Sequence, residues 1–177
     1  MTVTIRPASP RDLPALTAIK HEAGLAAWPH ILPAEVIAAL PFPDRWATAI
    51  GSTDPRVAVL VAETEGSVVG FAITRPSGDD DAAPRTGELD AFYSAPDVWG
   101  LGVGRALLSA AVIALAQAGF DDATLWTAAD NHRPRRIYEL AGWRTDGATR
   151  RRSPGGTAFS ELRYRLGLRP NKVTFGR

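Results

Sequence analysis

The chain has 177 residues, 45% of them apolar and 22% charged, which suits one globular domain with a sizeable core and is too little for two ordinary domains. A formal net charge of +1 argues against a surface built to neutralise nucleic acid, and the absence of cysteine excludes disulfides, thiolate metal sites and a cysteine nucleophile. No apolar run reaches the length of a membrane span and no signal-peptide core follows Met1, so we expect a cytoplasmic protein with no membrane partner.

The first half of the chain predicts a short strand, a helix, a helical region broken by prolines, and a β-hairpin with glycine at its turn. These elements are expected at residues 3–5, 9–23, 33–50, and 56–63 with 67–74. The next segment, residues 76–84, is rich in turn formers, so we expect a solvated loop whose acidic run is surface.

The second half alternates strands and helices before two closing strands. Strands are expected at 88–94 and 123–128, helices at 103–118 and 134–141, and closing strands from 143 and at 157–166. The helix at 103–118 is almost entirely apolar, so we expect it to be buried on most of its circumference. The order of elements predicts an α+β protein with a mixed sheet, forming a single domain over residues 1–167 with a C-terminal tail at 168–177.

A glycine-rich segment joins the strand at 88–94 to the apolar helix. Gly100, Gly102 and Gly104 allow close approach to the backbone, and the helix N-terminus behind them leaves amide N–H groups and a positive dipole end pointing at one spot. Such a place binds phosphate, and Arg105 adds a cation.

Other phosphate-binding motifs fit this segment less well. A Walker A loop requires lysine and then serine or threonine after the last glycine, but Gly104 is followed by Arg105 and Ala106. A dinucleotide fingerprint spaces its glycines G-x-G-x-x-G, whereas here they run G-x-G-x-G. A tight strand-to-helix turn that binds nothing is the remaining alternative.

The segment resembles the coenzyme turn of the GNAT superfamily of acyltransferases, which is written Arg or Gln, two residues, Gly, any residue, then Gly or Ala. Gly102 and Gly104 match this pattern, and Trp99 stands where the Arg or Gln is expected. The resemblance covers nearly the whole chain and implies a central, mixed, mostly antiparallel twisted sheet of about six to seven strands flanked by about four helices. It also implies acetyl-coenzyme A as cosubstrate, with main-chain groups of the preceding strand pairing with the pantetheine arm. The implied coenzyme contacts are Phe92, Tyr93, Ser94, Leu101, Gly102, Val103, Gly104 and Arg105.

A second match lies downstream. Asn131, Tyr138, Glu139 and Gly142 resemble the family's signature of Asn, a helix with Tyr-Glu, and Gly before an aromatic residue. Pro134 replaces the usual alanine, but it falls in the first helical turn, where a missing N–H does little harm. Two motifs in the right order are far more specific than either alone.

Acetyl transfer from a thioester to an amine requires removal of a proton from the amine and delivery of a proton to the departing thiolate. The resemblance puts the Tyr138 hydroxyl beside the coenzyme sulfur, which makes Tyr138 the candidate acid; a packed tyrosine with its hydroxyl at the rim is the alternative. Glu88, and after it Asp90, are candidate bases because alternation puts both on one face of their strand; solvent-facing carboxylates are the alternative.

The remaining candidates have two interpretations each. Asn131 is expected to bind the pantetheine arm, to cap the helix that follows it, or both. Arg135 and its neighbour Arg136 suit either the 3′-phosphate of the coenzyme or a solvated helix face, and residues 150–152 are expected on a surface turn. Trp28 and Trp46 belong either to the acceptor wall or to the core. The three histidines lack a metal-ligand spacing, so no metal is expected.

The sequence therefore predicts an N-acetyltransferase that moves the acetyl group of acetyl-coenzyme A directly to a primary amine. The alternative is a non-catalytic acyl-coenzyme A-binding regulatory module of the same fold. The sequence identifies no acceptor, since the acceptor loops of such enzymes vary freely. A homodimer is compatible with the chain, but nothing in the sequence requires one.

Overall fold

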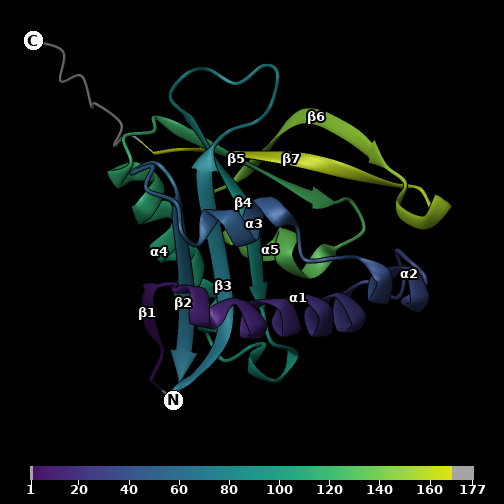
Figure 1. Cartoon of the computed structure of the whole chain (residues 1–177). Coiled ribbons are helices and arrows are strands. Elements are labelled where there is room, and N and C mark those ends of the chain that lie inside the picture. Colours follow the sequence, from purple (N-terminus) through teal and green to yellow (C-terminus); the bar gives the residue numbers. More distant parts are fainter. Residues whose placement is uncertain (1, 169–177) are drawn as a thin grey trace, which may run out of the picture.

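In the computed structural model, residues 2–168 are described and form a seven-stranded sheet with helices on both faces (Figure 1). The strands are β1 (Thr4–Pro7), β2 (Ala58–Thr64), β3 (Ser67–Pro76), β4 (Thr86–Ser94), β5 (Asp122–Ala128), β6 (Arg144–Arg152) and β7 (Phe159–Gly167). The helices are α1 (Leu13–Ala27), α2 (Ala34–Ala39), α3 (Asp44–Ala49), α4 (Val103–Gln117) and α5 (His132–Leu140), with short 3-10 turns at Pro10–Asp12, Pro96–Val98 and Pro154–Gly156.

The strand order is β1-β2-β3-β4-β5-β7-β6, and every neighbouring pair is antiparallel except β4 and β5. The predicted α+β fold with a mixed, mostly antiparallel sheet is therefore confirmed. Over the described residues there are five α-helices where about four were expected, because Pro33 and Pro43 each precede a separate six-residue helix. Proline has no N–H and cannot continue a helix, but it is well tolerated just before one begins.

The predicted hairpin of β2 and β3 is also confirmed. Thr64 pairs with Ser67 across a two-residue turn in which Glu65 (φ 52°) and Gly66 (φ 78°) both have positive φ. This geometry suits the right-handed twist of the flanking strands. Of the predicted tail, residues 168–177, only Leu168 lies among the described residues, and its N–H donates to the carbonyl of Asp121 over 2.9 Å.

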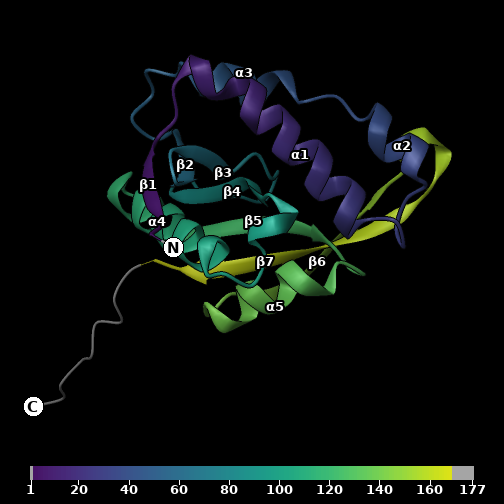
Figure 2. The ribbon, with the colours of Figure 1, turned by 90° about the horizontal axis from the view of Figure 1, so that it is seen from below.

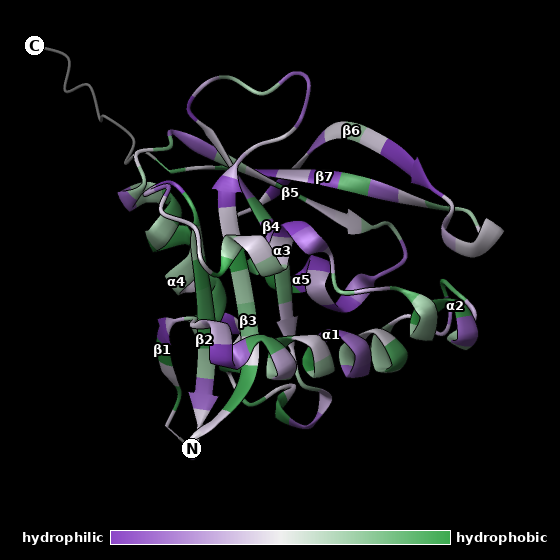
Figure 3. Cartoon of the chain, in the orientation of Figure 1, coloured by the Kyte–Doolittle hydropathy of each residue, from purple (hydrophilic) through white to green (hydrophobic). Residues whose placement is uncertain are grey.

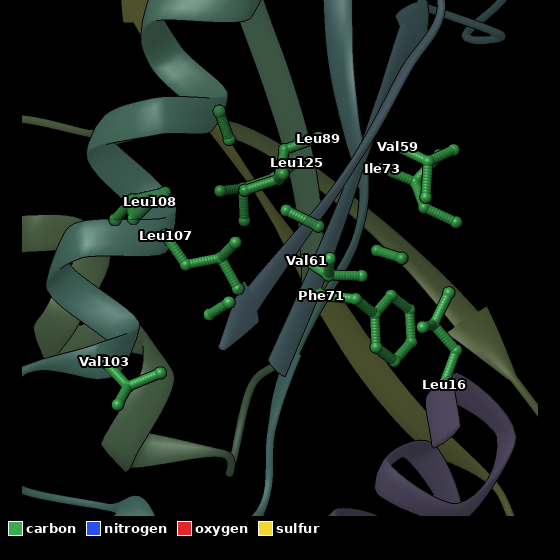
Figure 4. Packing of buried hydrophobic residues seen from close by; sticks show 14 of the residues in the cluster. Leu16, Val59, Val61, Phe71, Ile73, Leu89, Val103, Leu107, Leu108 and Leu125 are labelled. Carbon is green, nitrogen blue, oxygen red and sulfur yellow. The ribbon is translucent and has the colours of Figure 1, made fainter. Parts of the chain in front are cut away.

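The helices form two layers around the sheet. Helices α1, α2 and α3 lie on one face, while α4 and α5 lie on the other (Figure 2). Leu16 of α1 and Phe71 of β3 are buried on the first side, and Val103 and Leu107 of α4 on the second (Figure 4). Each such side chain contributes about 1.5–3 kcal/mol by leaving water. The apolar residues concentrate in β2, β3, β4 and α4, whereas the β6–β7 hairpin is largely polar (Figure 3).

The expectation that the apolar helix is buried on most of its circumference was wrong. Helix α4 buries five residues, among them Val103 and Leu107, but Ile113 on its outer side is 53% exposed. The reason is that the packing of α4 is concentrated on the side that faces β1 to β4. Alanines on the outer side limit the apolar area that water meets.

Candidate active site

Strands β4 and β5 separate in the middle of the sheet. Their parallel pairing involves only Thr86, Gly87 and Glu88 of β4, opposite residues 122–124 of β5. Beyond this point residues 89–94 and 125–128 diverge, and we call the space between them the notch. Each strand keeps its outer neighbour, β3 or β7, and within residues 2–168 no strand pairs with the facing edges, so the notch is bordered by two strand edges. An extended, amide-bearing ligand can pair with such an edge as another strand would.

A β-bulge in β4 decides which side chains face which layer. Leu89 pairs with Thr74 and Ala91 with Ile73, so Asp90 is the extra residue. An extra residue reverses the alternation that follows it. Tyr93 therefore stacks on Phe71, with ring centroids 5.3 Å apart, on the side of α3, whereas Phe92 turns toward Tyr138 of α5, at 5.8 Å.

The strand leads into the N-terminus of α4 through the glycine turn. Gly100 (φ 85°) and Gly102 (φ 92°) have backbone angles that L-residues resist, and Gly102, as the N-cap, supplies no capping side chain. No acidic residue occupies the first turn of α4, so its first amides have neither an intrahelical acceptor nor a carboxylate partner in that turn. A free, positive helix end of this kind binds an anion.

Gly104 indicates that the turn leaves room for a ligand. It lines the cavity described below, yet its φ is ordinary and a Cβ there would lie 3.7 Å from Phe92 and 3.9 Å from Ile137, which are ordinary contacts. The protein's own packing therefore does not require glycine at this position. A missing side chain at the mouth of a helix N-terminus allows close approach of a phosphate group.

Trp99, which departs from the family pattern, supports the turn in a different way. Its indole Nε1–H donates to the carbonyl of Ser94 over 2.9 Å, which joins the turn to the end of β4. The guanidinium of Arg133, in the first turn of α5, lies 4.6 Å from the centroid of the Trp99 ring. This cation–π contact places a positive charge beside the notch.

The notch opens into a cavity of about 680 Å³. Residues from β4, the glycine turn and α5 line one end, including Ser94, Trp99, Gly100, Gly104, Asn131, Arg133 and Tyr138. Residues from α1, α3 and the β6–β7 hairpin line the other, including Lys20, Trp28, Arg45, Trp46, Arg150, Arg152, Phe159 and Glu161. The volume suits a small molecule together with part of a larger cosubstrate.

Tyr138, on α5, lines the cavity. Its side chain is 6% exposed and packs between the rings of Phe92 and Trp143, with centroids 5.8 Å and 6.4 Å away. Burial raises the pKa of the Tyr138 hydroxyl well above its usual value, with smaller contributions from Tyr93 and Tyr164. At neutral pH this hydroxyl therefore carries its proton and acts as a donor.

Glu88 and Asp90 both line the cavity but differ in their partners. Asp90 accepts hydrogen bonds from Arg45 (2.9 and 3.0 Å) and from the indole of Trp46 (2.8 Å). Within residues 2–168 the one hydrogen bond to the Glu88 side chain is a long one, 3.4 Å, from the N–H of Gly78, and Arg75 lies opposite Glu88 on β3. Burial, and then the charge of Asp90, raise the pKa of the Glu88 carboxyl above its usual value. A carboxylate with a raised pKa and few partners is the better proton acceptor of the two.

The expectation that the acidic run of the 77–85 loop is only surface was wrong for Asp79. Its carboxylate accepts from Trp126 Nε1 (2.9 Å) and from Arg163 of β7 (3.2 Å), and Arg163 also binds Asp81 (2.6 Å) and Asp146 (2.7 Å). These bonds attach the loop to β5 and β7. The attached loop presents the N–H of Gly78 to Glu88.

The predicted coenzyme residues are distributed unevenly around the cavity. Asn131 is buried and lines the cavity, and its side chain makes no helix-capping hydrogen bond. Leu101, Gly102 and Arg105 are exposed outside the lining and Val103 is fully buried, so the residues of the turn that line the cavity are Trp99, Gly100 and Gly104. Arg135 also lies outside the lining, where its guanidinium donates to the Tyr164 hydroxyl (3.0 Å) and to the carbonyl of Ala129.

Several lining residues were missed by sequence reasoning. Arg150 and Arg152 were expected on a surface turn, but they end strand β6 and line the cavity. Arg150 stacks on the Trp126 ring at 4.3 Å and donates to Glu161 of β7. Residues 150–152 are all arginine and show no alternation, so their place in the cavity follows only from the pairing of β6 with β7.

Among residues 2–168, no group of histidine, aspartate and glutamate side chains is arranged to hold a metal ion. The helices of this part of the chain are also too short or too polar to cross a membrane.

Comparison with known proteins gives one consistent family. A family model described as the acetyltransferase (GNAT) family matches residues 16–143. A Mycobacterium tuberculosis protein named as an N-acetyltransferase is 28% identical over 171 residues, covering 93% of each chain. The mycothiol acetyltransferase of Propionibacterium freudenreichii is 36% identical over 90 residues, which is 51% of this chain but only 28% of that relative.

Solved structures share the fold at low sequence identity. The Salmonella typhimurium protein yncA, solved with its cofactor acetyl-CoA, superposes with a TM-score of 0.75 at 22% identity over 98% of both chains. The PaiA N-acetyltransferase of Thermoplasma acidophilum, solved with coenzyme A, superposes with a TM-score of 0.71 at 18% identity over 94% of this chain and 99% of that one.

Proposed function

The chain belongs to the acetyltransferase (GNAT) family, and on this premise we propose that it transfers the acetyl group of acetyl-coenzyme A directly to a primary amine. The observation that carries the proposal is the continuity of the site. The notch runs from the N-terminus of α4, past Tyr138, to Glu88, so an anion site, a proton donor and a proton acceptor line one cavity.

The residues present fit the coenzyme. The free amides at the start of α4, with the space left by Gly104, suit a pyrophosphate, and the unpaired edge of β4 suits the amides of the pantetheine arm. Arg133 and Asn131 add a cation and a buried amide side chain beside this path. When bound, acetyl-coenzyme A supplies an activated thioester.

Two side chains of the protein then handle protons. Glu88 accepts a proton from the ammonium group of the acceptor, directly or through water, because only the uncharged amine attacks the acetyl carbonyl. Tyr138 donates a proton to the sulfur as its bond to the acetyl group breaks. Asp90 takes up no proton, because Arg45 and Trp46 hold its carboxylate, and it contributes negative charge next to Glu88.

The rival within the same fold is a regulatory module that binds acyl-coenzyme A without turnover. Both functions require the anion site, but only an enzyme requires a protonated donor and a poorly partnered carboxylate in the same cavity. The positions of Tyr138 and Glu88 therefore favour the enzyme.

The proposal is tested by mixing the protein with acetyl-coenzyme A and a panel of amines while free thiol is measured with a chromogenic reagent. Amine-dependent thiol release is expected, together with thermal stabilisation by coenzyme A and none by ATP or NAD. Tight coenzyme binding without amine-dependent release would favour the regulatory module, and stabilisation by ATP or NAD alone would overturn coenzyme binding itself.

A further inference from the structure

Helix α5 carries the proposed proton donor but has a small apolar face. Tyr138 is its one buried residue and Ile137 is half-buried, whereas the other seven positions include a histidine, three arginines and a glutamate. Helix α4, on the same side of the sheet, buries five residues. A helix as short as α5 has little stability of its own, so its position depends on tertiary contacts. Polar contacts are therefore needed to fix α5 on the sheet.

A chain of hydrogen bonds supplies these contacts. Tyr164 of β7 is fully buried, and its hydroxyl accepts from Arg135 Nε over 3.0 Å and donates to Glu139 Oε1 over 2.7 Å. Arg135 also donates to the carbonyl of Ala129, the residue that follows β5. Because Arg135 and Glu139 are four residues apart, the Tyr164 hydroxyl joins two successive turns of α5 to the sheet. Figure 2 shows α5 beside β6 and β7.

Tyr138 lies between the two anchored positions of α5. It follows Arg135 by three residues and precedes Glu139 by one, so it lies on the adjoining side of the helix. Its ring packs against the ring of Tyr164, with centroids 6.1 Å apart. Its backbone carbonyl accepts from the N–H of Trp143 over 3.0 Å, which closes the end of the helix. The position of Tyr138 is thus tied to β7 and to the strand that follows α5.

The Tyr138 hydroxyl depends on this anchoring because nothing holds it directly. Within residues 2–168 it forms no hydrogen bond, and Tyr138 lines the cavity. The direction of the hydroxyl is therefore set by the packing of its ring and by the position of α5. A donor must lie within hydrogen-bond reach of the atom that takes its proton, and a misplacement of about 1 Å can reduce a rate about 100-fold.

The residues of the hydrogen-bond chain lie outside the cavity. Arg135, Glu139 and Tyr164 are absent from its lining, and Glu139 and Tyr164 border a separate shallow cleft with Leu140. Their influence on the reaction must therefore pass through α5. A role in coenzyme binding, which was expected for Arg135, predicts a different kinetic effect from a role in fixing α5.

We propose that Tyr164 and Arg135 are positioning residues for acetyl transfer, which hold α5 against β5 and β7 so that the Tyr138 hydroxyl meets the coenzyme sulfur. This inference rests on the proposed role of Tyr138 as proton donor. Arg135 suits the task because its planar guanidinium directs two donors at once, to Tyr164 and to the carbonyl of Ala129. Glu139 completes the chain by accepting from the Tyr164 hydroxyl.

The variant Tyr164→Phe removes one oxygen and leaves the ring in place. Thiol release is measured with the fastest of four amine probes: phenethylamine, spermidine, phenylalaninamide and lysine. We expect kcat to fall about three- to tenfold, the scale of a lost hydrogen bond. KM for acetyl-coenzyme A, and coenzyme A affinity by calorimetry, should stay within about twofold, because Tyr164 lies outside the cavity lining.

Two further variants test the same chain of bonds. Arg135→Met removes every donor from a partly exposed side chain, so it replaces Tyr164→Phe if that variant does not fold, and it should lower kcat with KM for acetyl-coenzyme A unchanged. Its matched control is Arg11→Met, at an exposed arginine outside the cavity, which should change neither. Glu139→Gln keeps an oxygen that accepts from Tyr164, so it should restore most of the kcat lost in Glu139→Ala.

A double-mutant cycle with Tyr138→Phe separates positioning from a general loss of structure. If Tyr164 acts through the Tyr138 hydroxyl, Tyr164→Phe should have no further effect on kcat in a protein that already lacks this hydroxyl. An equal fall in kcat in both backgrounds would overturn the inference while leaving acetyl transfer intact.

The other outcomes are also distinct. A raised KM for acetyl-coenzyme A with unchanged kcat in Arg135→Met would assign Arg135 to the coenzyme and contradict its positioning role. Normal turnover in Tyr138→Phe would remove the donor and the inference with it. The absence of amine-dependent thiol release from the native protein with every probe would instead overturn the proposed function.

Discussion

The two ends of the cavity differ in whether backbone or side chains form them. The end at the glycine turn is formed mainly by the backbone of a single stretch from Ser94 to Gly104, with the side chains of Asn131, Arg133 and Tyr138 beside it. The other end, which we call the acceptor end, is formed by side chains from α1, α3, β4, β5, β6 and β7, and some of them are held by partners on other elements, as Trp46 is by Asp90 and Arg150 by Glu161. The first end depends mainly on local backbone geometry, whereas the second depends on side chains that several helices and strands bring together.

The difference predicts how each end responds to substitution. A substitution at the glycine turn that restricts the backbone should weaken coenzyme binding and leave the rate of acetyl transfer from the bound coenzyme unchanged. At the acceptor end and along the notch, loss of a single polar atom should reduce turnover and leave coenzyme binding unchanged.

The largest effect is expected from Glu88→Gln. The amide cannot accept a proton, so kcat/KM for the amine should fall by roughly 100-fold or more, the usual contribution of a general base. Coenzyme A affinity, measured by calorimetry, should stay within about twofold. The control is Glu22→Gln, an exposed carboxylate on α1 outside the cavity, which should leave both quantities unchanged.

The pH profile tests the same residue. Glu88 must be deprotonated to accept a proton, and its pKa is raised, so activity should increase with pH through a pKa above 4.5. Burial keeps Tyr138 protonated beyond its usual range, so no loss from this group is expected as pH rises toward 10. An acidic limb that persists unchanged in Glu88→Gln would assign the base to another group.

Tyr138→Phe should reduce turnover by roughly 10- to 100-fold, because the ring stays in place and only the proton donor is lost. Single-turnover thiol release separates this effect from coenzyme binding, which should change little. The melting temperature should also change little, since the contacts with Phe92 and Trp143 are made by the ring. Normal turnover in a well-folded Tyr138→Phe protein would remove the assignment.

Gly102→Ala tests the other end, with Gly119→Ala as a matched control. Both glycines have positive φ, at 92° and 85°, and at both a Cβ would have open space around it, so each substitution should cost about 1 kcal/mol of stability. Only Gly102→Ala should raise KM for acetyl-coenzyme A, by about five- to tenfold, with kcat nearly unchanged. Equal kinetics in the two variants would mean that the turn does not hold the coenzyme.

The smallest effect is expected at the 77–85 loop. Asp79→Asn weakens the bond to Arg163 while the amide oxygen can still accept from Trp126, so a loss of about 1 kcal/mol in stability is expected. Because the loop presents the N–H of Gly78 to Glu88, kcat/KM should fall two- to fivefold, by the usual scale of a weakened polar contact, and the acidic limb of the pH profile should shift. Asp80→Asn, at the exposed neighbour, should do neither.

The same contrast explains what could be predicted from the sequence. The order of elements, the mixed sheet and the glycine turn follow from patterns within a few residues of one another, and the turn carries its own signature in Gly100, Gly102 and Gly104. The structural role of Trp99 was not predictable, because its partner, the carbonyl of Ser94, is defined only by the fold of the turn.

The acceptor end was less predictable for physical reasons. The bulge at Asp90 reverses the alternation of β4, so Tyr93 and Phe92 exchange the faces that a regular strand would give them. The partners of Asp79, which are Trp126 and Arg163, lie on β5 and β7, and a pairing between segments so distant in the sequence has no local signature. Arg150 bonds Glu161 across the β6–β7 hairpin, and this pair can be recognised only once the two strands are aligned. From the sequence alone, a run of charged residues is therefore assigned to the solvated surface even where it lines a site.

A crystal structure with coenzyme A bound tests the central claim most directly. The account predicts the pyrophosphate against the first amides of α4, the pantetheine arm along residues 89–94 of β4, and the sulfur near the Tyr138 hydroxyl on the side facing Glu88. A pyrophosphate held by residues 150–152 of β6, or an arm lying outside the notch, would contradict it.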